Sequence, residues 1–485
     1  MGKKKQQTAT ATPSGVSRRN FMKGLAGASA AMAGIAAPLE AFAAAQGKAD
    51  GERAKWIKTV DGYPFKLTEE FKRYNCSHNA FNWIGRHLNT VWNRPASKNF
   101  LDLVLSGNAG KGVPVKDVGM ARLYAGVASG LWSTCAPFNR TGMGFENVGS
   151  QSWTKLTYPP LGPGERKPDI TDPNLLTRYT KGVARMVGAD QVGIAPFDPN
   201  WIYTHSQRNP YQPGDPVLKE IRIDDASIPE ETDDALIIPS DAKAVIVLAF
   251  GMNRVMVQTS PAYTCDGIVG LGYTRMAIAT TGLADFIRTQ GYWAIPSNNC
   301  TGLSVPMAVQ AGLGEVGRHG LLISPELGSG IRLAKVITNM PLNLAKPISF
   351  GVESFCESCL KCARECPAKC LTEGSQTTAA LNGCNNPGTL KWYNDYQKCL
   401  GFWVENGVSC SNCIAVCPFT KGEMWAHGAT MWAIDNIPSM NGIWLGLDDG
   451  FGYGERRDPS EIWDTVSSYG IDPELFAKIR KAGGR

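Results

Sequence analysis

The cysteines near the C-terminus constrain the fold of this chain more than any other feature. They form two runs that each end in Cys-Pro, and the first run has the spacing C-x2-C-x2-C-x3-C. The first run comprises Cys356, Cys359, Cys362 and Cys366, and the second comprises Cys399, Cys410, Cys413 and Cys417. Runs of this kind hold [4Fe–4S] clusters, whose corners need four converging thiolates. We therefore expect two [4Fe–4S] clusters.

The assignment of ligands follows from the way such runs are shared. In two-cluster ferredoxins the fourth cysteine of each run binds the other cluster. The expected ligand sets are Cys356, Cys359, Cys362 and Cys417 for one cluster, and Cys399, Cys410, Cys413 and Cys366 for the other. Zinc sites usually show paired C-x2-C halves, and disulfide frameworks usually occur in short chains. Neither alternative explains two runs that end in Cys-Pro.

Residues 1–45 have the pattern of an export signal. Lys3 to Lys5 precede the arginine pair Arg18-Arg19, an Ala/Gly-rich stretch follows, and Ala41-Phe42-Ala43 offers a cleavage site. Paired arginines indicate the twin-arginine pathway, which carries folded proteins and would export a cluster-loaded chain. We find no apolar run of 18 residues after residue 45, so attachment to a membrane would need a partner. The alternative, an amphipathic N-terminal helix, lacks a periodic apolar face.

The rest of the chain has the composition of a globular protein with two or three domains. It has 485 residues and a net charge of +6. Much of that charge lies in the export signal, which leaves little basic surface for nucleic acid. Apolar patterns predict helices at 175–187 and 273–290, and a Pro/Gly-rich loop at 159–174. They predict strands at 191–195, 244–250, 294–296, 321–323 and 333–338. We therefore expect an α+β fold with α/β-like layers.

A glycine-rich segment lies between the predicted strands at 294–296 and 321–323. Gly312 to Gly320 contains four glycines in nine residues, including G-x-G-x-x-G. Alone this motif suggests a dinucleotide site, but no strand is predicted directly before it. The twin-arginine signal, the glycine-rich segment and the two cysteine runs, in this order, resemble the respiratory reductive dehalogenases over essentially the whole chain. The glycine-rich core is also similar to that of the epoxyqueuosine reductases.

The resemblance implies a domain organisation and a second cofactor. It implies a nitroreductase-like core at 175–349 that binds a cobamide (corrinoid), and a ferredoxin-like two-cluster domain at 350–420. Residues 46–174 and 421–485 would pack on the core as an N-terminal region and a C-terminal tail. None of the chain's five histidines has an aspartate two residues before it, as the D-x-H-x-x-G motif of many cobalt-ligating histidines requires. This agrees with a base-off cofactor that has no protein ligand, and equally with no cobamide at all.

The resemblance also implies roles for individual residues. Tyr273 would donate a proton, Asn299 would contact the departing halogen or orient the substrate, and Arg332 would stabilise the tyrosinate left behind. From the sequence alone, each could equally be an ordinary packing or surface residue. The expected cobamide contacts are Gly312, Gly314 and Gly317, with Ser304, Met307 and His319 as weaker candidates. Trp403 is a candidate wall of an apolar substrate pocket, although core packing is nearly as plausible.

The implied function is that of a reductive dehalogenase. Such an enzyme replaces halogen by hydrogen, or eliminates vicinal halogens, with a cob(I)amide reduced through two [4Fe–4S] clusters. It would act outside the cytoplasmic membrane as the terminal reductase of anaerobic organohalide respiration. Its partners would be a membrane-integral anchor protein and a quinone-linked or hydrogenase-linked electron donor, with no nucleic acid and with a homodimer left open.

Two alternatives belong to other classes of function. An exported two-cluster electron carrier without cobamide would leave about 300 residues before the clusters without a task. An epoxyqueuosine-reductase-like enzyme acting on tRNA is disfavoured by the export signal and by the lack of a basic surface signature.

Overall fold

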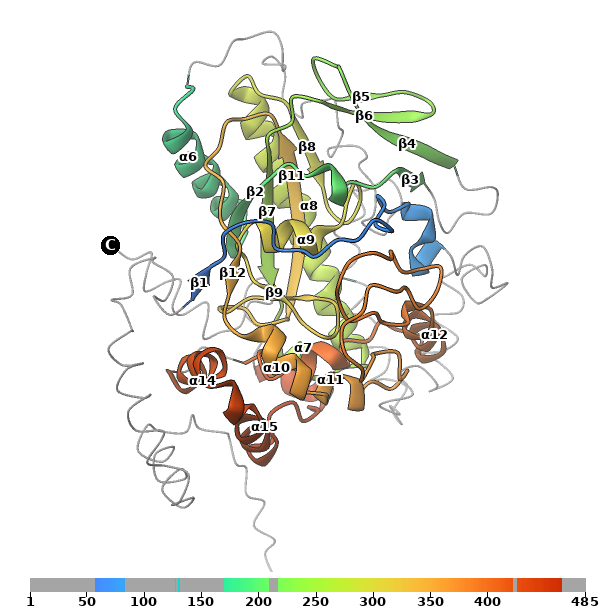
Figure 1. The fold of residues 1–485 in the computed structure, drawn as a ribbon, viewed down its shortest axis with the longest axis vertical. Helices are drawn as coiled ribbons and strands as arrows, with labels where there is room; N and C mark the ends of the chain where they lie inside the picture. Colours follow the sequence, from blue (N-terminus) through green and yellow to red (C-terminus); the bar gives the residue numbers. More distant parts are fainter. Residues whose placement is uncertain are drawn as a thin grey trace, which may run out of the picture.

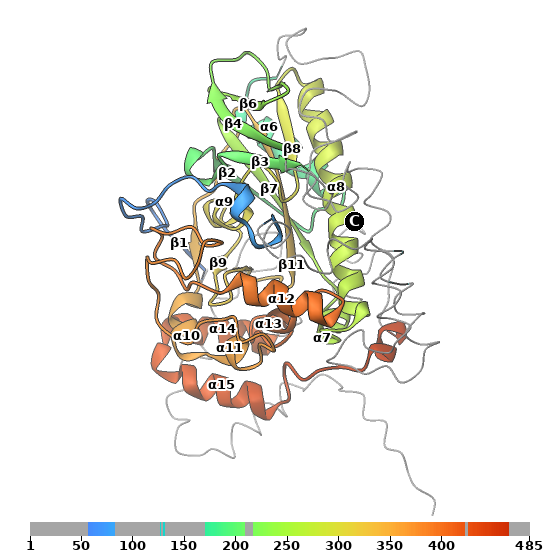
Figure 2. The same ribbon diagram turned by 90° about the vertical axis from the view of Figure 1, so that its right-hand side faces the viewer.

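The computed structural model describes residues 57–82, 127, 130, 170–208, 217–421 and 425–464. The expected export signal and most of the expected N-terminal region lie outside the described residues. Figures 1 and 2 show a central layer of strands, a second sheet at one end and helices α10 to α15 gathered at the other end.

The central sheet has four strands in the order β2-β7-β11-β8, and all neighbouring strands are antiparallel. The strands are β2 (Gln191–Pro196), β7 (Ala244–Gly251), β8 (Ala294–Ser297) and β11 (Ile331–Thr338). The four predicted strands at these positions are thereby confirmed. β7 is almost entirely buried because helices cover both faces of the sheet, and this explains its unbroken apolar sequence.

Alternate residues of the central strands face two different layers. Ile246 and Val336 pack in the core that contains α8 (Tyr263–Thr289) and α6 (Pro173–Met186). Val247 and Ile337 point the other way, into the core that contains α9 (Ser304–Gln310). The two-residue period of a strand therefore separates two cores, and a residue's place on β11 decides which layer it reaches.

Helix α8 is longer than the sequence predicts. The expected helix began at residue 273, but α8 begins ten residues earlier, at Tyr263. The first turns of α8 were not predicted because glycine is a poor helix former, and this stretch contains Gly267, Gly270 and Gly272. Tyr273 consequently lies inside a long buried helix and not at a helix start, which corrects the sequence reading.

The remaining strands lie outside the central sheet, and one of them, β10 (Leu322–Ile323), confirms the strand predicted at 321–323. A second sheet has the order β3-β4-β6-β5, with β4 and β6 parallel. Its strands are β3 (His205–Arg208), β4 (Val217–Asp224), β5 (Glu230–Glu231) and β6 (Ala235–Pro239). Two small pairs join β1 (Lys58–Thr59) to β12 (Ile348–Ser349), and β9 (Glu315–Val316) to β10 (Leu322–Ile323).

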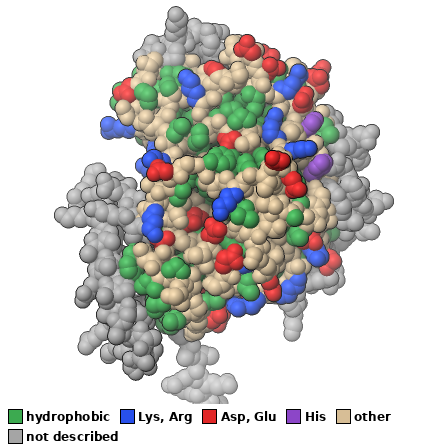
Figure 3. All heavy atoms as spheres, viewed as in Figure 1, with side chains coloured by type: hydrophobic (Ala, Val, Ile, Leu, Met, Phe, Trp, Pro, Cys, Tyr) green, Lys and Arg blue, Asp and Glu red, His purple; other side chains and the backbone are tan. Residues whose placement is uncertain are grey.

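Short helices carry the cysteine runs at the end of the molecule opposite the second sheet (Figure 1). The helices of this end are α7 (Arg254–Gln258), α10 (Val352–Ser358), α11 (Lys361–Arg364), α12 (Tyr396–Asn406), α13 (Asn412–Ala415), α14 (Trp425–Asn436) and α15 (Asn441–Gly450). On the face drawn in Figure 3, acidic and basic side chains are interspersed over the described part of the chain.

Candidate active site and cysteine clusters

Three residues that are far apart in the sequence meet between α8, β11 and the loop after β8. The Asn299 Nδ2 donates a hydrogen bond to the Tyr273 Oη at 2.5 Å. The guanidinium carbon of Arg332 lies 5.7 Å from the centre of the Tyr273 ring. A buried phenol thus has an amide donor on its oxygen and a permanent positive charge over its ring, and a hydrogen bond and a nearby opposite charge both favour the ionised form of such a group. This arrangement suits a phenol that gives up a proton.

Gly272 provides the space in which the Arg332 side chain packs against α8. A Cβ at this position would lie 2.5 Å from the Arg332 Cγ, so only glycine allows the arginine side chain to cross α8. Arg332 faces α8 because it alternates along β11 with Ala334 and Val336. Its Nε is buried and has no hydrogen-bond partner among the described residues. A buried donor without a partner is costly, and it would be satisfied by a ligand.

Hydrogen bonds within the loop that contains Asn299 fix its conformation. The Ser297 Oγ donates to the Cys300 carbonyl at 2.6 Å, and the Gly302 amide donates to the same oxygen at 2.8 Å. Thr301 adopts the left-handed conformation with a φ of 73°, which is rare for a β-branched residue. Strain of this kind persists where the surrounding structure over-determines a functional segment.

Trp403 lies on α12 and makes an edge-to-face contact with Phe81, with 5.9 Å between the ring centres. Its indole Nε1 is buried without a hydrogen-bond partner among the described residues. The pair offers apolar surface with one free donor, which is the character expected for a wall of a small-ligand pocket. A role for Trp403 toward substrate stays a prediction.

Contacts within the chain explain why glycine occupies several positions of the Gly312 to Gly320 segment. Gly312 has a φ of +69°, and a Cβ there would lie 2.5 Å from the Lys346 carbonyl oxygen. A Cβ on Gly317 would lie 2.7 Å from the Ile323 Cδ1, and one on Gly314 would collide with the Ile323 carbonyl. The segment is therefore folded tightly on its own backbone, and contact of these glycines with a cobamide stays a prediction.

The three weaker cobamide candidates differ in character. The Ser304 Oγ accepts a hydrogen bond from the Lys335 Nζ at 3.0 Å, and Met307 is buried in the α9 core. The Nδ1 of His319 accepts from the Leu321 amide at 3.1 Å, which assigns its proton to Nε2. Burial lowers the pKa of His319 to about 4, so the ring is neutral at pH 7. Its buried Nε2 lacks a partner among the described residues and fits an acceptor such as the amide groups of a cobamide.

The first cysteine set comes together from both runs. Cys356, Cys359 and Cys362 each interact electrostatically with Cys417, although that residue belongs to the second run. Burial raises the pKa of Cys359 to about 11 and that of Cys362 to about 12. Buried thiols bind iron only as thiolates, so the positive metal would have to compensate this cost of deprotonation.

The second set contains one more thiol than the sequence predicts. Cys366, Cys410 and Cys413 are electrostatic neighbours. Cys399 is joined to them through Cys370, whose Sγ lies 3.3 Å from the Cys366 Sγ. The spacing of the two runs does not include Cys370, and its position four residues after Cys366 is the signal that could identify it. Among the described residues no group of side chains converges on a single metal ion, and a cubane spreads its ligands more widely.

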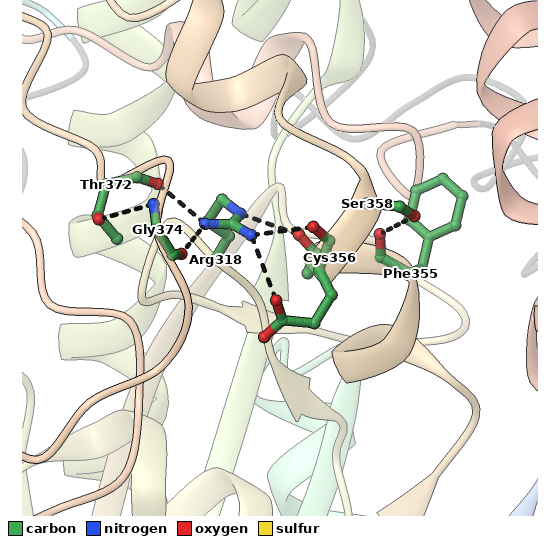
Figure 4. A network of polar contacts seen from close by, with 7 residues as sticks. Arg318, Phe355, Cys356, Ser358, Thr372 and Gly374 are labelled. Atoms are coloured by element: carbon green, nitrogen blue, oxygen red, sulfur yellow. Dashed lines mark hydrogen bonds and ion pairs between the residues drawn. The ribbon is translucent and has the colours of Figure 1, made fainter.

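Arg318, which the sequence did not indicate, joins the glycine-rich segment to the first cysteine run (Figure 4). Its Nε donates to the Cys356 carbonyl at 2.9 Å. One terminal nitrogen donates to the carbonyls of Thr372 and Gly374 at 3.0 and 2.6 Å. The buried guanidinium also lies over the Trp392 ring at 5.0 Å. It therefore fixes the loop of the first cysteine run and places positive charge near Cys362.

Comparisons with known proteins give a consistent result. No family model matches the chain. A tetrachloroethene reductive dehalogenase of Sulfurospirillum multivorans is 39% identical, over 95% of this chain and 96% of that protein. Another of Desulfitobacterium hafniense is 36% identical over 61% of this chain and 58% of that protein. An epoxyqueuosine reductase of Lactococcus garvieae is 30% identical over 25% of this chain and 32% of its own.

Solved structures share the fold. A catabolic reductive dehalogenase matches with a TM-score of 0.59 and 20% identity, covering 83% of this chain and 50% of that chain. A second, whose title concerns B12-dependent dehalogenation, matches with a TM-score of 0.57, covering 82% of this chain and 49% of that chain. This chain therefore corresponds to about half the length of those solved chains.

Proposed function

The chain belongs to the reductive dehalogenase family, and from this premise we propose that it replaces a halogen of an organohalide by hydrogen. In the overall reaction a carbon–halogen bond breaks, two electrons and one proton are consumed, a carbon–hydrogen bond forms and halide leaves. The observation that carries the proposal is the convergence on Tyr273 of Asn299, which donates to the phenolic oxygen, and of Arg332, whose guanidinium lies over the ring.

The chain's own residues handle the proton. The Tyr273 Oη supplies it to the carbon that loses halogen. The Asn299 amide and the Arg332 charge then stabilise the phenolate, and burial of Tyr273 limits the access of water to its oxygen. Because the Asn299 Nδ2 has two hydrogens, one amide group can hold the phenol and still orient a halogen.

We further propose which residues hold the cofactors. The two thiol sets would bind one [4Fe–4S] cluster each, and the buried His319 N–H would contact a cobamide. A bound cobamide would supply reducing electrons at its cobalt, and the clusters would relay these electrons singly. The finer fold assignment stays part of this proposal: a nitroreductase-like core at 175–349, a ferredoxin-like domain at 350–420, and packing regions at 46–174 and 421–485.

The substrate we propose is a chlorinated ethene. Two relatives, 39% and 36% identical to this chain, are named as tetrachloroethene reductive dehalogenases. A small haloalkene has little to hydrogen-bond, and the Trp403–Phe81 pair offers aromatic surface of the matching kind.

The proposed setting is the outer face of the cytoplasmic membrane after twin-arginine export, with a membrane-integral anchor and a quinone-linked or hydrogenase-linked donor. Within the described residues, none of the helices has the length and apolar character needed to span a bilayer.

Tyr273→Phe tests the proposal directly. We expect the purified variant to keep its cobalt and iron but to lose about 100-fold or more in kcat, the size of a general-acid contribution. Tyr263→Phe, a buried tyrosine on the same helix, is the matched control and should stay near wild-type activity. Undiminished turnover in Tyr273→Phe would remove this residue from the mechanism.

A further inference from the structure

Lys335 is a buried cation on β11, three residues from Arg332. It is 0% exposed and points to the opposite side of the sheet from Arg332, toward the start of α9. No ion pair joins it to a carboxylate of the described residues, and the groups that favour its charge are its two hydrogen-bond acceptors and the nearby thiols of Cys300 and Cys76. An isolated buried ammonium is expensive, and a chain that needed only packing here would place an apolar residue.

The ammonium binds both ends of the loop that presents Asn299. Its Nζ donates to the Asn298 carbonyl at 2.9 Å and to the Ser304 Oγ at 3.0 Å. The Asn298 carbonyl belongs to the peptide unit that continues into Asn299, so fixing this oxygen fixes the direction in which Asn299 leaves the loop. Hydrogen bonds from an ionised donor are about twice as strong as neutral ones.

The residue that follows the Asn298 carbonyl, Asn299, extends its side chain into the candidate active site. The Asn299 Nδ2 reaches the Tyr273 Oη at 2.5 Å, and the Thr301 backbone two residues later is strained. A strained backbone conformation persists only where surrounding contacts stabilise it. Lys335 provides such contacts through its hydrogen bonds to Asn298 and Ser304, on either side of Thr301. Burial lowers the pKa of Lys335 to about 8, which still leaves the side chain largely charged at pH 7.

We propose that Lys335 is a positioning residue of the dehalogenation site, which sets Asn299 against Tyr273 from the far side of the central sheet. The inference rests on the proposed function. It adds a residue without any contact to substrate, connected to the phenol through one peptide and one amide side chain.

The test compares Lys335→Met, which keeps the length and the apolar stem, with Lys335→Gln, which keeps an N–H donor. Lys391→Met is the matched control, because Lys391 is another lysine whose pKa burial lowers to about 8, and it lies over the Tyr393 ring. We expect Lys335→Met to lose about 10- to 100-fold in kcat, the scale of a misplaced catalytic group. KM should change less than about threefold, and Lys335→Gln should recover part of the loss.

Two further readouts separate positioning from general damage. Asn299→Ala should cost much less in the Lys335→Met background than in the wild type, because both changes remove the same contact. A crystal structure of Lys335→Met or Lys335→Gln should show the Asn299–Tyr273 contact lengthened or lost, with cobalt and iron contents unchanged. Independent losses in the double mutant, or an unchanged loop with unchanged kcat, would overturn the inference.

The crystal structure of the Lys335 variants also distinguishes failure of the proposed dehalogenase function from failure of the proposed positioning role of Lys335. A wild-type protein without dehalogenase activity would refute the proposed function, while the loop displacement would still decide whether Lys335 positions Asn299. If Lys335→Met does not fold, Lys335→Gln together with Ser304→Ala, which removes one acceptor of the ammonium, gives the same comparison.

Discussion

Gly272 determines whether Arg332 can reach Tyr273. In most helix interiors a Gly→Ala change stabilises the fold by roughly 0.5–1 kcal/mol. At residue 272 the added Cβ would lie 2.5 Å from the Arg332 Cγ, so the arginine must move away from the phenol. We expect Gly272→Ala to lower kcat by about tenfold or more while helix α8 persists.

Gly182→Ala is the matched control for this change. Gly182 lies in helix α6, and a Cβ there would meet nothing within 4 Å. We expect Gly182→Ala to raise the melting temperature slightly and to leave turnover unchanged. Equal kinetics for the two variants would show that Arg332 does not depend on the space at Gly272.

Cys370 provides a second prediction for single residues. Its Sγ lies 3.3 Å from that of Cys366, so it can reach the same iron if Cys366 is removed. We expect Cys370→Ser to bind eight irons, as two [4Fe–4S] clusters demand. Cys366→Ser should keep a second cluster with an altered electron paramagnetic resonance signal, and the double variant should lose it. Loss of that cluster in Cys366→Ser alone would rule out the rescue by Cys370.

Residue patterns indicated the eight cysteines that we propose as cluster ligands, but not the residues that support the site. Spacing alone indicated these cysteines, because most ligands of such a cluster lie close together in the sequence. Tyr273, Asn299 and Arg332 were accessible only through family resemblance, since contacts between α8, the β8–α9 loop and β11 leave no local pattern. Lys335 and Arg318 look like surface residues in the sequence, because burial of a charge depends on tertiary packing.

At the scale of elements, the glycine-rich segment is the junction between the central sheet and the cysteine-bearing helices. Arg318 makes this junction through carbonyls of the 356–374 region. Arg318→Met should leave those buried carbonyls unpaired, at about 1–3 kcal/mol for each group not reached by water. We expect a melting temperature lower by several degrees and fewer irons per chain.

Arg364→Met is the control for the Arg318 variant, because Arg364 lies in α11 within the first cysteine run but is about half exposed. Melting curves and iron assays of the two variants should therefore differ clearly. If Arg318→Met melts and binds iron like the wild type, the junction does not depend on this guanidinium.

Glu315 makes the same junction sensitive to pH. Its carboxylate accepts from the Phe350 amide at 2.6 Å, and burial raises its pKa from 4.5 to about 7. Between these values the folded chain keeps a proton that the unfolded chain has lost, so this group's contribution to stability declines as pH rises from about 4.5 to 7. Glu315→Gln keeps an acceptor and cannot ionise.

The difference between wild type and Glu315→Gln isolates this contribution, because other titrating groups cancel. We expect the wild-type melting temperature, relative to that of the variant, to fall by the equivalent of about 1–3 kcal/mol over this window. Parallel melting curves from pH 4.5 to 7.5 would mean that Glu315 has no raised pKa in the folded chain.

At the scale of the whole molecule, sequence patterns found the central sheet but not its surroundings. β7 was predictable because a strand covered on both faces is continuously apolar, and β11 was predictable from the apolar residues on either side of Lys335. The second sheet was missed because β4 mixes charged and apolar residues and its parallel partner β6 follows only after a hairpin with β5. The antiparallel order β2-β7-β11-β8 depends on long-range pairing that no local pattern records.

The central claim is that one chain combines the Tyr273 site with a cobamide and two clusters. Elemental analysis of protein purified without oxygen, from cells supplied with corrinoid, tests it most directly. The account predicts about one cobalt with about eight iron and eight acid-labile sulfide per chain. Eight iron without cobalt would contradict it, because the chain would then be an exported electron carrier in which Tyr273, Asn299 and Arg332 have only structural roles.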